Sequence, residues 1–103
     1  MDQKHRVLIN RNFIQLSNSL ATAVDEVCIQ LWCEQIISDV MKEKILVKSG
    51  PRQKADALLD LILSRGPHAF EALYRSALDA RLFDAADILH PDLKPHGTTV
   101  NTY

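Results

Sequence analysis

The sequence contains little glycine and proline, with three glycines and four prolines among 103 residues. So small a share excludes collagen-like and low-complexity chains, which depend on these residues. It also leaves few sites for the turns between closely spaced strands, whereas alanine, leucine, isoleucine and aspartate recur throughout. Hydrophobic residues make up 47% of the chain, which is enough apolar mass for one compact core. The composition therefore predicts a single domain of the all-α class.

The chain also lacks an excess of one charge sign, since twelve basic residues face thirteen acidic ones and the formal net charge is -1. Its overall field does not attract nucleic acid or anionic membrane, so electrostatic recognition must use local patches. Long apolar runs are missing too: clusters such as Leu61-Ile62-Leu63 are far shorter than the roughly 20 residues that cross a bilayer. The polar N-terminus lacks the apolar stretch of a signal peptide. We therefore expect a cytoplasmic protein that binds neither nucleic acid nor membrane.

Cysteine is scarce, and the two that occur, Cys28 and Cys33, are five residues apart. On a helix this spacing places them on different faces, which favours two reduced thiols over a disulfide. Cys28 falls on an apolar stripe with no histidine near it in sequence, so it lacks the setting of a protease nucleophile. The four histidines are scattered without the spacing of a zinc site: His5, His68, His90 and His96. We expect no catalytic residue, no metal site and no cofactor.

Apolar residues recur with the helical period through most of the chain. The first stripe predicts one helix from about Gln3 to Ser19, and it consists of Ile9, Phe13, Leu16 and Leu20. Five further segments have the same period, and they begin near Thr22, Ser38, Pro51, Pro67 and Leu82. No period continues past His90-Pro91. The pattern therefore predicts six helices in a domain of residues 1–90, followed by a flexible tail or linker at 91–103.

Residues suited to helix ends mark several of these boundaries. Thr22 is followed three residues later by an acidic residue, an arrangement that resembles a capping box, and Ser38 offers a similar N-cap. Pro51 and Pro67 suit a first helical turn, which needs no amide hydrogen from that position. Gly66 is predicted to end the helix that precedes it.

Three short segments resemble one family. The run Ser64-Arg65-Gly66-Pro67-His68-Ala69-Phe70 is similar to the Arg-Gly-x-x-Ala-Phe junction between helices four and five in the caspase recruitment domains (CARDs) of initiator caspases. Leu8-Ile9-Asn10-Arg11-Asn12 looks like a stretch near the start of these prodomains, and Ala85-Ala86-Asp87-Ile88-Leu89 resembles their final helix. The resemblance extends over residues 1–90 and identifies the chain as similar to a CARD.

This resemblance implies the death fold, which is a Greek-key bundle of six antiparallel helices whose first helix is commonly bent or broken. It also implies homotypic binding that brings an initiator caspase to an activating scaffold in apoptotic signalling. The partner is then a CARD-containing scaffold, adaptor or caspase. If the chain belongs to an initiator caspase, the cysteine protease domain lies beyond residue 103. The alternatives are a stand-alone adaptor or decoy that regulates caspase activation, and a helical nucleic-acid-binding domain, which the net charge disfavours.

Family members dock a basic surface on one domain against an acidic surface on the next. The resemblance assigns the basic face to Arg11, Arg52 and Lys54. It assigns the acidic face to Asp25, Glu26, Glu34, Asp39 and Glu43. Asp56 stands where some members carry an arginine, and its charge weakens the basic field. A domain with a face of each sign can self-associate head to tail.

Overall fold

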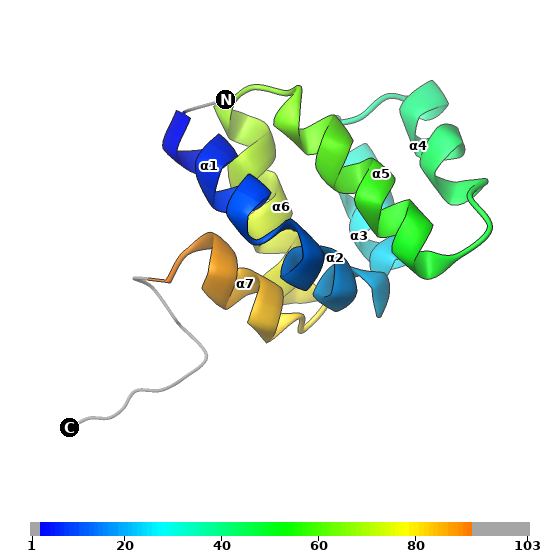
Figure 1. Ribbon diagram of the computed structural model, residues 1–103. Coiled ribbons are helices and arrows are strands. Elements are labelled where there is room, and N and C mark those ends of the chain that lie inside the picture. The colour runs from blue at the N-terminus through cyan, green and yellow to red at the C-terminus, as the bar shows by residue number, and fades with distance from the viewer. Residues whose placement is uncertain (1–2, 92–103) are drawn as a thin grey trace.

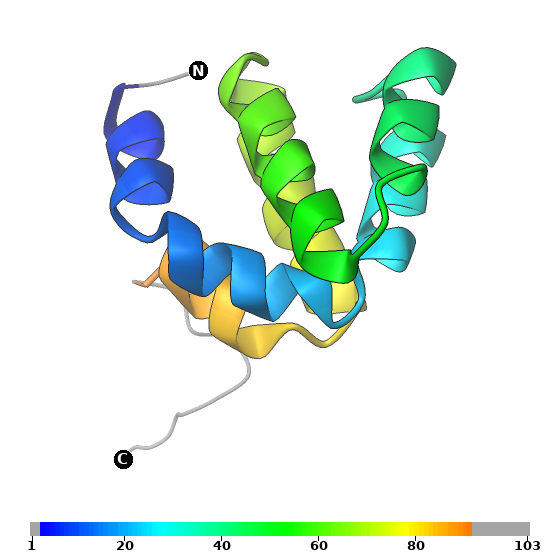
Figure 2. The same ribbon diagram turned by 45° about the vertical axis from the view of Figure 1, so that its right-hand side comes forward.

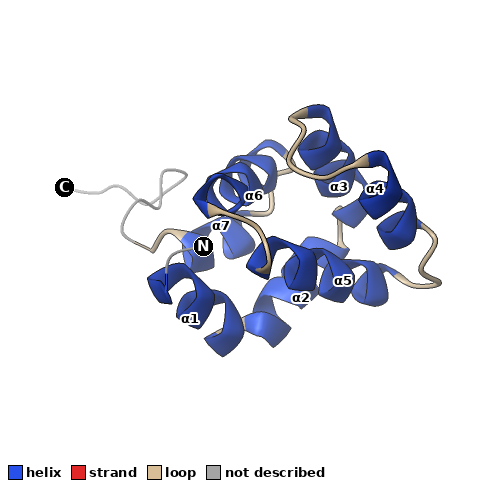
Figure 3. Cartoon of the chain, turned by 90° about the horizontal axis from the view of Figure 1, so that it is seen from above, coloured by secondary structure: helices blue, strands red, loops and turns tan. Residues whose placement is uncertain are grey.

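The computed structural model describes residues 3–91, and all regular structure in that range is helical. Figure 1 shows the helices wound into one bundle, and Figure 3 shows how short the loops between them are. The seven helices are α1 (Gln3–Arg11), α2 (Phe13–Ala21), α3 (Val24–Cys33), α4 (Asp39–Leu46), α5 (Pro51–Leu63), α6 (Pro67–Asp79) and α7 (Phe83–Leu89). The predicted all-α class is confirmed. The predicted tail falls almost entirely at 92–103, outside the described residues.

The first predicted helix is broken at Asn12, and Figure 2 shows the change of direction between α1 and α2. Asn12 has φ -114° and ψ 22°, outside the α-helical region, and its side-chain amide donates to the carbonyl of Leu8 at 2.9 Å. Its backbone N–H is shared between the carbonyls of Leu8 and Ile9, each at 3.2 Å. Ile9 before the bend and Leu16 after it are both fully buried in the core. The sequence stripe alone therefore wrongly predicted one continuous helix, and α2 also extends past Ser19 to Ala21.

The two predicted N-caps behave differently. Ser38 caps α4, because its hydroxyl accepts the N–H of Met41 at 3.2 Å. Thr22 has φ -67° and ψ -23°, so it continues the α2 helix and cannot take the extended conformation of an N-cap. Its hydroxyl instead donates to the carbonyl of Ser19 at 2.8 Å, and α3 begins at Val24 without a side-chain cap. The capping box predicted at Thr22 is therefore wrong.

Pro51 and Pro67 are the first residues of α5 and α6, as predicted. Gly66, however, is the extended N-cap of α6 and does not end α5. That helix closes one turn earlier, where the Ser64 hydroxyl donates to the carbonyl of Leu61 at 2.7 Å.

The core lies between α2, α5 and α6, with α3 and α7 packed against it. Its largest fully buried side chains come from every helix except α4, and they include Ile9, Leu16, Leu31, Leu59, Phe70 and Leu89. Helix α4 contacts only α3 and α5 closely, and α1 contacts α2, α5 and α7. Both views in Figures 1 and 2 therefore place α1 and α4 at opposite ends of the bundle. None of the helices at 3–91 is long and apolar enough to cross a membrane.

Candidate partner-binding surfaces

Arg11 is the last residue of α1 and is exposed. Helix α1 carries no acidic residue, and its other cations are Lys4 and Arg6. Arg6 is engaged within the fold, since its Nη1 donates to the carbonyl of Leu63 at 2.6 Å. Arg11 makes no ion pair with any residue that the structure describes. Its guanidinium therefore presents its full charge to solvent.

Arg52, the second residue of α5, is bonded to α2. Its Nε donates to the Ser17 hydroxyl and its Nη1 to the side-chain oxygen of Asn18, both at 2.7 Å. Asp56 lies on the same side, with its Oδ1 at 3.4 Å from that Nε, and it also accepts the hydroxyl of the buried Ser17. Arg52 therefore joins two core helices, and Asp56 offsets part of its charge.

Lys54 and Asp25, which the sequence assigned to faces of opposite sign, are neighbours. The Nζ of Lys54 on α5 lies 2.9 Å from an Asp25 carboxylate oxygen in the first turn of α3. Glu26 follows in the same turn and is exposed. Because their opposite charges are paired at short range, Lys54 and Asp25 contribute less to any long-range field than their formal charges suggest.

Glu34 follows the last residue of α3 and faces α6. Its Oε1 accepts the Nη2 of Arg75 at 2.9 Å, and its Oε2 accepts the amide of Gln30 at 3.1 Å. These hydrogen bonds, that of Arg75 first, hold the pKa of the Glu34 carboxyl below its ordinary value of 4.5. Glu34 is therefore anionic at neutral pH and tied to its own molecule.

Asp39 and Glu43 lie one turn apart on α4 but differ in their surroundings. Asp39 accepts the indole N–H of Trp32. Lys42 covers the face of the same indole at 3.7 Å from the ring centroid, which leaves it within 3.8 Å of a Glu43 oxygen. The side chain of Glu43 is still 74% exposed. Asp39 is thus bonded to Trp32 of α3, whereas most of the Glu43 side chain is open to solvent.

Arg11 and Arg52 lie near different parts of α2. Arg11 precedes the first residue of α2, whereas the acceptors of Arg52 lie in the middle of that helix. Sequence reasoning missed Ser17, Asn18 and Arg75 as partners of predicted site residues. Each of these contacts joins residues at least 34 positions apart, and helical periodicity carries no signal about such pairs.

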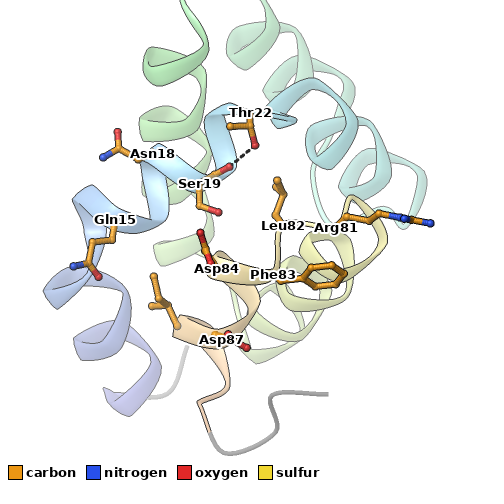
Figure 4. A pocket seen from close by; sticks show the side chains of 10 residues that line it. Gln15, Asn18, Ser19, Thr22, Arg81, Leu82, Phe83, Asp84 and Asp87 are labelled. Carbon is orange, nitrogen blue, oxygen red and sulfur yellow. Dashed lines mark hydrogen bonds between the residues drawn. The ribbon is translucent and has the colours of Figure 1, made fainter. Parts of the chain in front are cut away.

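Figure 4 shows an open hollow between α2 and the start of α7. Asp84 and Asp87 lie along it, and Arg81 points out of it. Its lining contains neither histidine nor cysteine and consists of Gln15, Asn18, Ser19, Thr22, Arg81, Leu82, Phe83, Asp84, Asp87 and Ile88.

Cys28 is fully buried, whereas Cys33 is exposed. Burial first, and the nearby Asp25 carboxylate second, raise the pKa of the Cys28 thiol to about 11. At neutral pH the sulfur is protonated and shielded, so it is a poor nucleophile. Across residues 3–91, no group of three or more metal-ligating side chains is placed to hold an ion.

Residues 3–91 thus form an all-helical bundle whose surface carries side chains of both charge signs. The family model of the caspase recruitment domain, which is a class of protein-interaction module, matches residues 6–90, and the chain belongs to this family. No curated protein sequence and no solved structure matches it significantly. The predicted death fold is confirmed, with seven helices in place of six because the first is broken.

Membership of the family establishes the coarse function. A CARD is an interaction domain without catalytic activity, and it binds other CARD-containing proteins in signalling. Which residues make that contact, and with which partner, belongs to the proposal that follows.

Proposed function

We propose that this domain recruits an initiator caspase to an activating scaffold in apoptotic signalling, through direct contact between oppositely charged CARD surfaces. The observation that supports this most is the exposed Arg11, which makes no ion pair with any residue at 3–91. It ends helix α1, which has no acidic residue and lies at the end of the bundle opposite to α4, the helix that carries Glu43. The α1 end of the molecule can therefore approach acidic side chains of a partner, and the α4 end can approach basic side chains of a partner.

The proposed basic face consists of Arg11, Arg52 and Lys54, and the proposed acidic face of Asp25, Glu26, Glu34, Asp39 and Glu43. Arg11 and Glu26 are exposed, and the side chain of Glu43 is 74% exposed although it lies 3.8 Å from Lys42. The other members are bonded to their own molecule. The charges of such a contact raise its specificity and its association rate, and added salt weakens the binding. We expect a small, individually weak interface that becomes effective when a scaffold gathers several copies.

The Arg65-Gly66 junction supports the caspase assignment within the family. It forms the connection from α5 into α6, followed by Ala69 and Phe70 in the buried face of α6. The assignment further proposes residues 1–90 as the binding domain, residues 91–103 as a linker and the cytoplasm as the site of action. A stand-alone adaptor or decoy would use the same faces. A caspase-activation assay shows whether the added domain stimulates or inhibits caspase activation.

The experiment is a pull-down from cell extract with the domain as bait. The variants are Arg11→Glu, which reverses the accessible charge, and Arg81→Glu, which makes the same change at an exposed arginine outside both faces. Circular dichroism and thermal unfolding check that both variants fold. Mass spectrometry should find a CARD-bearing scaffold or caspase with the wild type and with Arg81→Glu, and little or none with Arg11→Glu.

Equal recovery of the CARD partner with Arg11→Glu would remove Arg11 from the interface. Recovery of no CARD protein by any bait would contradict the proposed recruitment. A gel shift with non-specific DNA tests the nucleic-acid alternative in parallel, and we expect no shift at physiological salt.

A further inference from the structure

Arg65, in the connection between α5 and α6, carries a guanidinium that the fold leaves poorly satisfied. Its Nε is buried without a hydrogen-bond partner, and its Nη2 donates to the thioether sulfur of Met41, which is a weak acceptor. It makes no ion pair with any residue that the structure describes. Arg6, Arg52 and Arg75, by contrast, each donate to an oxygen atom. A partly desolvated cation without an anion is costly to hold in a folded chain.

The side chain of Arg65 is partly exposed and lines a groove formed with the end of α3, the loop into α4 and the start of α4. Figure 1 shows that this loop and the loop after α5 lie at the same end of the bundle. The groove has a volume of about 680 Å³, which is within the range of ligand-binding pockets. Its apolar wall includes Trp32, Ile36 and Met41. The groove therefore combines an unsatisfied cation with an apolar surface.

Trp32 is held in place at this groove by two contacts. Its indole N–H donates to the carboxylate of Asp39, and the Lys42 ammonium lies 3.7 Å from the ring centroid. The side chain is partly buried. A large aromatic surface that is already fixed needs little ordering when a ligand packs on it, so Trp32 suits an anchor position for a partner.

The charges around the groove restrict the chemistry of its ligand. Among the residues that line it, Arg65 is the only cation and Asp39 the only anion. The Asp39 carboxylate repels a doubly charged phosphate more strongly than a singly charged carboxylate, and a carboxylate also matches the planar guanidinium. The apolar wall favours an apolar group close to that carboxylate. An aspartate or glutamate side chain next to an apolar side chain meets both requirements.

We propose that this groove binds an acidic linear segment of a partner protein, whose carboxylate pairs with Arg65 while a neighbouring apolar side chain packs on Trp32 and Ile36. The site is additional to the two charged faces proposed above and shares only Asp39 with them. It recognises a short peptide, so it does not require the partner to have a CARD fold.

The test is an NMR titration of the isotope-labelled chain with three capped dipeptides: glutamyl-leucine, glutaminyl-leucine and glutamyl-glycine. The Arg65 Nε–H and Trp32 indole N–H signals report on the site directly. Glutamyl-leucine should shift both signals and bind in the millimolar range, because so small a ligand makes few contacts. The other two probes should each bind about tenfold more weakly, since one lacks the charge and the other lacks the apolar side chain.

Two variants separate the site from the rest of the surface. Arg65→Gln should weaken the binding of glutamyl-leucine by about tenfold or more, because it removes the charge that pairs with the carboxylate. Arg81→Gln makes the same change at an exposed arginine that does not line the groove, and it should leave the binding unchanged. Circular dichroism verifies that both variants fold.

The unsatisfied state of Arg65 has its own measurement. Without peptide, Arg65→Met should raise the urea midpoint of unfolding, since an apolar side chain of similar length replaces a cation that lacks an anion. Arg81→Met controls for the change in net charge and should leave the midpoint unchanged. A lower midpoint for Arg65→Met would show that the fold itself satisfies the guanidinium, and this would overturn the proposal.

The proposal would equally be overturned if glutamyl-leucine left the Arg65 and Trp32 signals unmoved. Equal binding of glutaminyl-leucine and glutamyl-leucine would contradict the role of the carboxylate, and unaltered binding to Arg65→Gln would contradict the site. None of these outcomes depends on the pull-down, because the probes contain no folded partner.

Discussion

Arg52 illustrates how a predicted binding residue can serve the fold. Its two hydrogen bonds to α2 satisfy the buried Ser17 hydroxyl and the Asn18 side chain. The type of residue and its place at the start of a helix could be read from the sequence. Its acceptors could not, because they are more than thirty positions away and their approach depends on how α2 packs on α5.

Charge reversal at this position should therefore affect stability as well as binding. Arg52→Glu removes both hydrogen bonds and places a second carboxylate beside Asp56, so we expect the free energy of unfolding to fall by about 1–2 kcal/mol. Urea denaturation measures this, with Arg81→Glu as the control for the change in net charge. An unchanged unfolding midpoint would show that the Arg52 contacts contribute nothing to the fold.

Glu34 gives the domain a pH-dependent contact. Its pKa is lower in the folded chain than its ordinary value of 4.5, so the stabilisation is fully present above that value and is lost as the pH falls through the folded pKa. Arg75→Gln should raise the pKa of Glu34 toward 4.5, which an NMR titration of its carboxyl carbon detects. Between about pH 5 and pH 3, this variant should lose less stability than the wild type. Identical titration curves for Glu34 in both proteins would contradict the assigned cause.

At the scale of helices, the apolar period located every helical segment, but it merged α1 and α2 into one helix and fixed only some of the ends. Two turns carry no sequence signal because the chain turns there without glycine. Gln35 and Arg81 both have positive φ, at 63° and 62°, directly beyond the C-termini of α3 and α6. Glycine is the usual residue in this conformation, so neither position signals its turn in the sequence. The break at Asn12 was likewise invisible to periodicity, because the stripe continues across it.

The contrast between the two predicted caps can be measured. Ser38→Ala removes the acceptor for the Met41 N–H and should cost about 1 kcal/mol of unfolding free energy. Thr22→Ala removes only a hydroxyl that donates within α2, and we expect a loss below about 0.5 kcal/mol. Urea titrations of the two variants provide the comparison. A larger loss for Thr22→Ala than for Ser38→Ala would contradict the capping found in the structure.

At the scale of the whole molecule, family and fold class were accessible from the sequence, whereas the charged faces were predicted only as sets of residues. The family match over residues 6–90 bears out the resemblance to a caspase recruitment domain. The structure divides the predicted sets by their contacts. Lys54 and Asp25 are paired with each other, whereas Arg11 and Glu43 are exposed on α1 and α4, which lie at opposite ends of the bundle. Sequence alone cannot make this division, because it depends on which helices meet.

The central claim is that oppositely charged ends of the domain bind other CARDs. It is tested most directly by titrating the purified CARD recovered in the pull-down against the wild type, Arg11→Glu and Arg81→Glu at low and high salt. We predict that Arg11→Glu raises the dissociation constant by about tenfold or more at low salt, that Arg81→Glu does not, and that salt weakens wild-type binding. Equal affinities for the wild type and Arg11→Glu, independent of salt, would contradict the account.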